Sequence, residues 1–222
     1  MEIEQAVKEL DALFEKYKIK DARNFLNFRN DFISYVKSLE NKDLQDEFDK
    51  QEFFYDFVEL QKKVGWDKDL LNEYTMVVSS ASKNLKQLFT PQQVNKILGK
   101  IAIKEESNTF YDATGGTGST VISAWWEWSK KQKCFNDTYN HLAYIDELDI
   151  YNCYCCVFNF LIRGMNAIVS NIDTLEQTRY ETFIISNGYP EKKCWFSKYK
   201  TLTNEELEEQ NLILARGNNG RN

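Results

Sequence analysis

The sequence has one histidine, His141, and five cysteines in 222 residues. A single histidine makes histidine-based catalysis a poor expectation and favours a structural role for His141. The odd number and irregular spacing of the cysteines fit a reducing compartment better than a disulfide framework. The cluster Cys153-Tyr-Cys-Cys156 does not predict a metal site, because adjacent cysteines on a helix point in different directions and no second Cys/His pair completes a tetrahedron.

Long apolar runs and an excess of positive charge are also missing. No stretch approaches the roughly 20 apolar residues that a membrane span requires, and the start lacks a basic segment followed by an apolar core. We therefore expect a cytoplasmic protein without a membrane anchor. The formal net charge of −6 argues against a broad basic face for DNA or RNA. Four lysines could touch phosphate locally, although a solvated surface is the commoner explanation; they are Lys192, Lys193, Lys198 and Lys200.

Apolar side chains recur at helical spacing through the first 85 residues, as in Leu10, Leu13, Phe14 and Tyr17, and predict a helical layer. Beyond residue 90 helices and strands alternate, which predicts a mostly parallel sheet with helices on its faces and a ligand outside the carboxyl ends of the strands. The expected elements are helix 91–103, strand 109–112, helix 119–130, strand 142–147, helix 149–163, and strands 167–171 and 182–186.

Three regions follow from this pattern. We expect an N-terminal helical region over 1–84, an α/β domain over 85–200, and an acidic helix with a disordered tail over 201–222.

The most informative segment is the glycine-rich turn Asp112-Ala-Thr-Gly-Gly-Thr-Gly-Ser119, placed between a predicted strand and a predicted helix. Glycine allows a tight turn and close approach of a ligand, and the helix that follows begins with unpaired N–H groups. The turn is not a phosphate-binding P-loop, because no lysine follows Gly118. It is not the dinucleotide fingerprint either, since Val121 replaces the third glycine.

Four segments in order resemble the adenine-specific DNA methyltransferases, particularly the modification subunit of type I restriction systems and small phage-encoded relatives. They are Gln87-Leu-Phe-Thr-Pro91, Asp112 to Gly118, Tyr144-Ile-Asp-Glu-Leu-Asp149, and Asn159-Phe-Leu-Ile-Arg-Gly-Met-Asn-Ala167 followed by Asp173. The resemblance implies a Rossmann-like methyltransferase sheet, truncated at its C-terminus and preceded by the helical layer. It covers about residues 85–175.

The resemblance also implies S-adenosylmethionine as the cofactor. A carboxylate at the end of the second strand, Glu147, can accept the two ribose hydroxyls, and Asp173 would accept the adenine amine. Asp112 can attract the ammonium of the methionine moiety. The cofactor-binding residues implied are Phe89, Thr90, Asp112, Thr114, Gly116, Gly118, Glu147 and Asp173.

Other interpretations of these acids stay open. Asp112 and Glu147 could be helix caps or exposed acids, and the same alternative holds for Asp173. If the strand register differs by one or more residues, Asp146 or Asp149 would replace Glu147.

The catalytic motif of these methyltransferases, Asn/Asp-Pro-Pro-Tyr/Phe after the fourth strand, is absent. The nearest segment is Ser186-Asn-Gly-Tyr-Pro190. There Asn187 could accept hydrogen bonds from the target amine and Tyr189 could stack on a flipped base. An ordinary turn after a strand is the alternative.

Two functions are consistent with the sequence. The first is an S-adenosylmethionine-dependent DNA adenine methyltransferase with a degenerate catalytic motif, of a restriction-modification or phage type, which acts on DNA with a partner subunit. The second is a non-catalytic methylase-like protein that binds a protein partner such as a host defence component. No metal is expected in either case.

Overall fold

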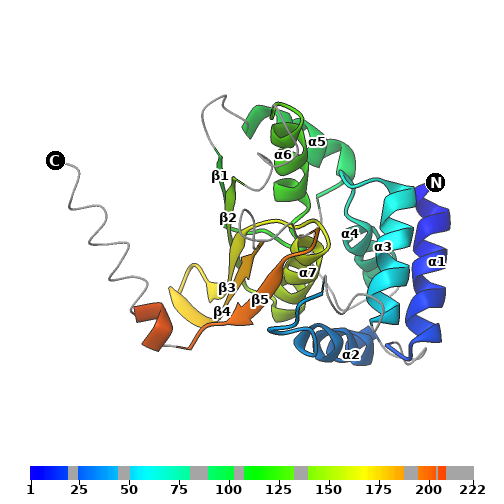
Figure 1. Cartoon of the computed structure of the whole chain (residues 1–222), viewed down its shortest axis with the longest axis horizontal. Helices are drawn as coiled ribbons and strands as arrows, with labels where there is room; N and C mark the ends of the chain where they lie inside the picture. Colours follow the sequence, from blue (N-terminus) through cyan, green and yellow to red (C-terminus); the bar gives the residue numbers. More distant parts are fainter. Residues whose placement is uncertain are drawn as a thin grey trace.

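The computed structural model describes residues 1–19, 25–44, 51–80, 90–102, 108–132, 140–187, 195–203 and 205–208. Within these ranges seven helices surround one side of a five-stranded sheet (Figure 1). The elements are α1 (Ile3–Lys16), α2 (Phe25–Lys37), α3 (Glu52–Val64), α4 (Leu70–Ser80), α5 (Gln92–Ala102), β1 (Thr109–Asp112), α6 (Ser119–Ser129), β2 (Leu142–Glu147), α7 (Ile150–Leu161), β3 (Ala167–Asp173), β4 (Thr178–Ser186) and β5 (Lys198–Thr201).

The sheet has the strand order β1-β2-β3-β4-β5 and a mixed direction. The first three strands are parallel neighbours, whereas β4 and β5 are antiparallel. Residues 174–177 join β3 to β4, and so short a connection allows a hairpin but no crossover to a parallel position. The α/β class and the mostly parallel core expected from the sequence are confirmed. The sequence pattern revealed neither the direction of β4 nor the presence of β5.

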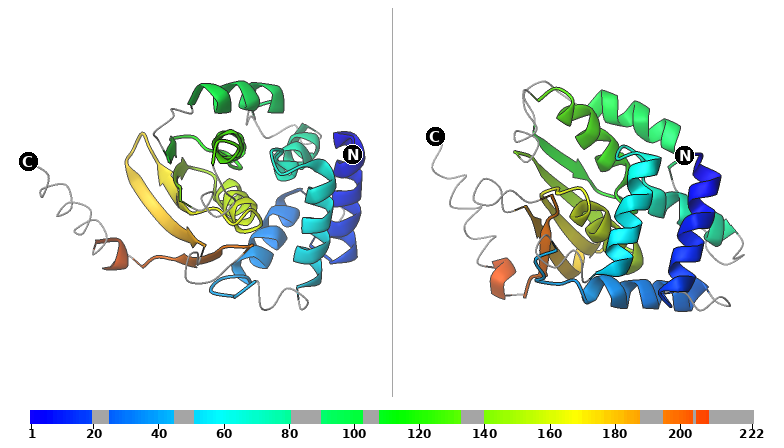
Figure 2. Two further views of the ribbon diagram at one scale, coloured as in Figure 1. Left: turned by 45° about the horizontal axis from the view of Figure 1, so that its top comes forward. Right: turned by 45° about the vertical axis from the view of Figure 1, so that its right-hand side comes forward.

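Helices α1 to α7 lie over one face of the sheet, not over both as the sequence pattern suggested (Figures 1 and 2). Helix α6 connects β1 to β2, and α7 connects β2 to β3. Crossovers of one hand that step in the same direction across a sheet place their helices on the same face. Phe110, Ile145 and Val169 on the covered face are buried, whereas Tyr111, which lies on the opposite face, is 66% exposed.

Helix α7 forms the centre of the molecule, between the sheet and the other helices (Figure 2). Residues 151–161 are all buried. The Tyr154 ring lies 5.0 Å from Phe183 of the sheet, and the Phe158 ring lies 5.6 Å from Phe32 of α2. A helix that is apolar on all sides must be covered on all sides, and the sequence of α7 has that property.

The N-terminal helices share this core with the sheet instead of forming a separate body. The chain after α2 runs beside the edge strand β5. The amide of Asn41 donates to the carbonyl of Tyr199 at 2.9 Å, and the amide of Thr201 donates to the Glu40 carboxylate at 2.6 Å. The expected region boundary at residue 84 falls outside the described residues and stays a prediction.

The acidic segment near the C-terminus begins a helical turn over residues 205–208. Thr203 and Glu206 form a reciprocal cap: the Glu206 amide donates to the Thr203 hydroxyl at 3.2 Å, and the Thr203 amide donates to the Glu206 carboxylate at 2.9 Å. This threonine and glutamate spacing is the capping-box pattern of a helix start. The expected tail over 209–222 lies outside the described residues.

The cysteines of α7 should be inert in the folded protein. Cys153, Cys155 and Cys156 are free and buried, and burial raises the pKa of each thiol above its usual range, so the reactive thiolate is disfavoured. We expect iodoacetamide at pH 8 to leave the peptide carrying these three residues unmodified in the native protein and to label it fully in denaturant. Peptide mass spectrometry measures both. Labelling of native protein at the rate of the denatured chain would contradict this expectation.

Candidate functional site

The glycine-rich turn lies where β1 ends and α6 begins, at the carboxyl edge of the parallel strands. The amide of Gly115 donates to the carbonyl of Asp146 at 3.1 Å, which attaches the turn to the end of β2. The amide of Gly118 donates back to the carbonyl of Gly115 at 2.8 Å and closes the turn. Local hydrogen bonds thus place the turn against the two strands that the sequence predicted would carry a ligand.

Gly116 and Gly118 both have positive φ, +55° and +92°, a conformation that favours glycine. Their surroundings differ. A Cβ added to Gly118 would lie 3.0 Å from the Phe160 ring and 3.2 Å from the Cys156 sulfur, whereas one added to Gly116 would meet no atom of the described residues within 4 Å. The backbone at Gly116 therefore borders open space, so a ligand can approach it closely.

Glu147 contacts the turn at Gly116. Its Oε2 accepts the Gly116 amide at 2.8 Å, and its Oε1 accepts the Asp149 amide at 2.8 Å. Asp146 instead accepts the Tyr111 hydroxyl at 2.9 Å, and Asp149 caps α7. The three acids that could have ended β2 in different registers thus have separate structural roles. Of their carboxylates, that of Glu147 is the one that bonds to the turn.

Asp112 and Thr114 belong to the same turn. Asp112 ends β1, and its Oδ1 accepts the Thr114 amide at 3.1 Å. The Asp112 side chain is half-buried and Thr114 is exposed. The structure therefore brings Asp112, Thr114, Gly116, Gly118 and Glu147 together at one edge.

Two further expected residues precede α5. Thr90 is half-buried, and its carbonyl accepts the Asn95 side-chain amide at 3.0 Å. Asn95 in turn accepts the hydroxyl of Thr120 at 2.8 Å, in the first turn of α6. Asn95 therefore links Thr90 to the helix that follows the glycine-rich turn. Phe89 lies outside the described residues.

Asp173 has local partners in the β3–β4 hairpin. Its Oδ1 accepts the amides of Leu175 and Glu176, both at 3.0 Å. Asn171, two residues earlier, pairs with Glu147 across the strands, and its side-chain amide donates to the carbonyls of Glu147 and Leu148 at 3.1 and 2.7 Å. Asn171 holds the end of β2 and was not singled out in the sequence, because only the strand register places it beside Glu147.

Asn187 lies at the opposite end of the strands, where β1, β2 and β3 begin (the amino edge of the sheet). Because β4 is antiparallel, its last residues pair with the first residues of β3, as Ile185 does with Ala167. The Asn187 amide donates to the side chain of Asn166 at 2.7 Å. The structure therefore does not bring Asn187 to the glycine-rich turn, and its position does not support the interpretation that it orients a target amine there. Tyr189 lies outside the described residues.

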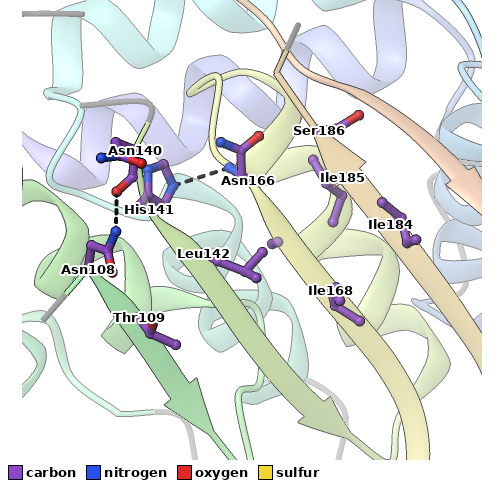
Figure 3. Close-up of a pocket in the computed structure, with 11 residues that line it drawn as sticks. Asn108, Thr109, Asn140, His141, Leu142, Asn166, Ile168, Ile184, Ile185 and Ser186 are labelled. Carbon is purple, nitrogen blue, oxygen red and sulfur yellow. Dashed lines mark hydrogen bonds between the residues drawn. The ribbon is translucent and has the colours of Figure 1, made fainter. Parts of the chain in front are cut away.

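An open hollow of about 570 Å³ lies at this amino edge. Figure 3 shows its asparagine rim, where the Asn108 side chain donates to the Asn140 carbonyl at 2.8 Å. His141 accepts the Asn166 amide through Nε2 at 3.1 Å and is buried. The single histidine thus has the structural role that the sequence favoured.

The N-6 DNA Methylase family matches residues 67–219, well over half of the chain. The chain belongs to this family. No curated protein and no solved structure matches it. Membership supports a DNA methyltransferase-like function, and the matched segment contains α4 through β5, with the glycine-rich turn and Glu147.

This methylase-family chain shows two further features in its described part. No group of three His, Cys, Asp or Glu side chains there is arranged to hold a metal ion. Lys198 pairs with Asp43 and Lys200 with Glu206, each at 2.8 Å, so both lysines have acidic partners. Lys192 and Lys193 lie outside the described residues.

Helices within the described ranges are too short or too polar to cross a bilayer.

The methylase fold here also contains a buried acid that the sequence analysis missed. Asp69 precedes α4 and is 5% exposed. It accepts the hydroxyls of Thr117 and Ser119 from the glycine-rich turn. A lone acid before an amphipathic helix resembles an ordinary helix cap, so its link to a turn 48 residues away had no local signal.

Proposed function

We propose that this methylase-family protein binds S-adenosylmethionine at the glycine-rich turn and acts on an exocyclic amine of adenine in DNA. The observation that carries the proposal is the convergence of Asp112 and Glu147 on a turn whose backbone at Gly116 borders open space. When bound, S-adenosylmethionine supplies an electrophilic methyl group on a sulfonium. The turn supplies one wall of the site and the two acids supply its polar contacts.

The polar groups around the turn match those of this cofactor. Glu147 uses one lone pair of each oxygen for the Gly116 and Asp149 amides, and a carboxylate has further acceptor capacity for two ribose hydroxyls. Asp112 ends the neighbouring strand, and its carboxylate can accept hydrogen bonds from the ammonium of the methionine moiety. The N-terminus of α6, directly after Gly118, favours a carboxylate. Asp173 would accept the adenine amine through Oδ2, because the hairpin amides of Leu175 and Glu176 both use its Oδ1.

Titration of S-adenosylmethionine into the purified protein tests this site by calorimetry. We expect saturable binding that weakens by about tenfold or more in Glu147→Ala, because each hydrogen bond to a charged group contributes about one tenfold step or more. Asp146→Ala is the matched control: it removes the same charge from the adjacent residue, whose carboxylate accepts the Tyr111 hydroxyl and whose bond to the turn is made by the backbone carbonyl, which alanine keeps. Binding in that control should change by about twofold or less.

A companion variant separates cofactor contact from turn support. Glu147→Gln keeps one acceptor oxygen for the Gly116 amide and places its own amide group against the Asp149 amide, so its melting temperature should fall by less than that of Glu147→Ala while its affinity still falls. Equal affinities of the Glu147 and Asp146 variants, or no binding by the intact folded protein, would contradict the proposed site.

A second candidate is a non-catalytic methylase-like protein that binds a partner. The position of Asn187 favours it, since the expected amide lies at the edge opposite the turn. Transfer of label from tritiated S-adenosylmethionine to adenine-containing duplex DNA distinguishes the two. Cofactor binding without transfer, also at the low ionic strength that lets an acidic protein approach DNA unaided, would support the non-catalytic function. If transfer occurs, Asn187→Ala should leave it intact.

The net charge of −6 bears on the DNA partner. Non-specific affinity for DNA comes mainly from lysine and arginine contacts to phosphate, and Lys198 and Lys200 are both ion-paired. We therefore propose that DNA binding depends on a partner subunit. The transfer assay should include DNA at low ionic strength, where an acidic protein alone has its best chance of contact.

A further inference from the structure

Asp69 connects three segments that are distant in sequence. Its Oδ2 accepts the hydroxyls of Thr117 and Ser119, both at 2.6 Å. Its Oδ1 accepts the Asn72 amide at 2.9 Å, at the start of α4, and the side-chain amide of Asn159 from α7 at 3.0 Å. One buried carboxylate thus receives four donors from α4, the glycine-rich turn and α7.

The two hydroxyls anchor the interior side of the turn. The turn presents Gly116 to open space, while Thr117 is buried and Ser119 is half-buried at the first position of α6. Both hydroxyls donate to the same oxygen, so they are held on a common side. Asn159 adds a bond to the Thr117 carbonyl at 3.0 Å. These contacts determine where the backbone of residues 116–119 lies relative to α7.

We infer that Asp69 is a positioning residue that holds the glycine-rich turn in its binding conformation. Asp69 is buried, and its four hydrogen bonds go to protein groups. It would therefore affect a ligand at Gly116 through the position of the turn and not by direct contact. The consequence for cofactor affinity rests on the proposed function. The consequence for the turn itself does not, since the contacts exist without a ligand.

Hydrogen exchange of the ligand-free protein tests the inference directly. In Asp69→Asn the side chain keeps one acceptor oxygen and places its amide group where two of the four donors bonded. We expect the amides of residues 116–119 to exchange about tenfold faster or more, since bonds to buried charged groups are each worth about that factor. Asp67→Asn is the matched control, because Asp67 lies in the same loop and pairs with Lys96 instead of the turn.

A second variant removes the contact from the other side. Thr117→Val keeps the shape of the side chain and loses one hydroxyl bond to Asp69. We expect the same turn amides to exchange faster, with a smaller effect than in Asp69→Asn. In the double variant with Asp69→Asn, the increase in the free energy of turn opening should be smaller than the sum of the two single increases, as expected for residues in contact.

The outcomes separate the alternatives. Faster exchange confined to residues 116–119, with β3 amides unchanged and S-adenosylmethionine affinity about tenfold lower than in Asp67→Asn, supports the inference. Turn exchange equal to that of Asp67→Asn overturns it. Equal acceleration of β3 amides also overturns it, because Asp69 would then support the whole fold. If the intact protein binds no S-adenosylmethionine, the proposed function fails, and the exchange comparison still decides the role of Asp69.

Discussion

Replacing Arg163 by methionine should lower the free energy of unfolding by about 3–5 kcal/mol, because two buried acceptors on Asn159 would each lose a charged donor. Arg163 is 5% exposed, and burial lowers the pKa of its guanidinium to about 10, so it is charged at neutral pH. It donates to the carbonyls of Trp66 and Lys68 at 3.1 and 2.6 Å and to Asn159 at 2.9 and 3.0 Å. Methionine fills similar space and donates to none of them.

The cost is large because the backbone carbonyl and the side-chain oxygen of Asn159 would both lose a buried donor. The part-buried Trp66 carbonyl would lose its Arg163 donor too, while the Lys68 carbonyl would keep the Gln61 side-chain amide. A buried acceptor left without a partner costs about 1–3 kcal/mol. Asn159 would also lose the contact that orients it toward Asp69, since its Oδ1 accepts from Arg163 while its Nδ2 donates to Asp69. The loop before α4 and the glycine-rich turn should therefore loosen together.

Urea unfolding followed by circular dichroism measures this change. Arg179→Met is the control, since it removes the same charge from an exposed position on β4. That variant should change the free energy of unfolding by about 0.5 kcal/mol or less. A difference between the two variants below about 1 kcal/mol would show that the network adds little to stability.

Phe158→Ala should cost about 3–5 kcal/mol, the usual range for removing a buried phenylalanine ring. The Phe158 side chain is fully buried on α7, and its ring centroid lies 4.9 Å from Phe57, 5.6 Å from Phe32 and 5.7 Å from Phe54. The ring therefore joins α7 to both α2 and α3. For a protein of this size the melting temperature should fall by roughly 6–20 °C.

Thermal melts should also show whether the helical layer and the sheet unfold together. Because Phe158 belongs to a core shared by both, the transition seen by circular dichroism should coincide with that seen by tryptophan fluorescence. Leu175→Ala is the control, since Leu175 is 95% exposed. Two separate transitions in the wild type, with only one shifted in Phe158→Ala, would show that the layers fold independently.

The elements themselves could be predicted from the sequence with few errors. The predicted strand over 109–112 matches β1, and the predicted strand over 142–147 matches β2. The spacing of apolar residues and the positions of glycines are local signals, which is why they locate strands and turns well. The parallel arrangement of β1 to β3 followed from the helices between them.

The direction of β4 was beyond such reasoning. A strand pattern over 182–186 gives no orientation, and the hairpin depends on extension of β3 to Asp173 and of β4 back to Thr178. That single feature moves Asn187 from the expected catalytic edge to the opposite one. The prediction of its role depended on topology, which side-chain periodicity does not encode.

The sequence by itself determined the family, the elements and the glycine-rich turn with the acids at the ends of β1 and β2, because each depends on residues close together in the chain. Only the tertiary structure decided what holds that turn. Asp69 reaches Thr117 across 48 residues, and Arg29 reaches Asp149 at 2.6 Å across 120. Such contacts form when burial of the shared core brings distant segments together, and no local pattern specifies which buried polar groups will then meet.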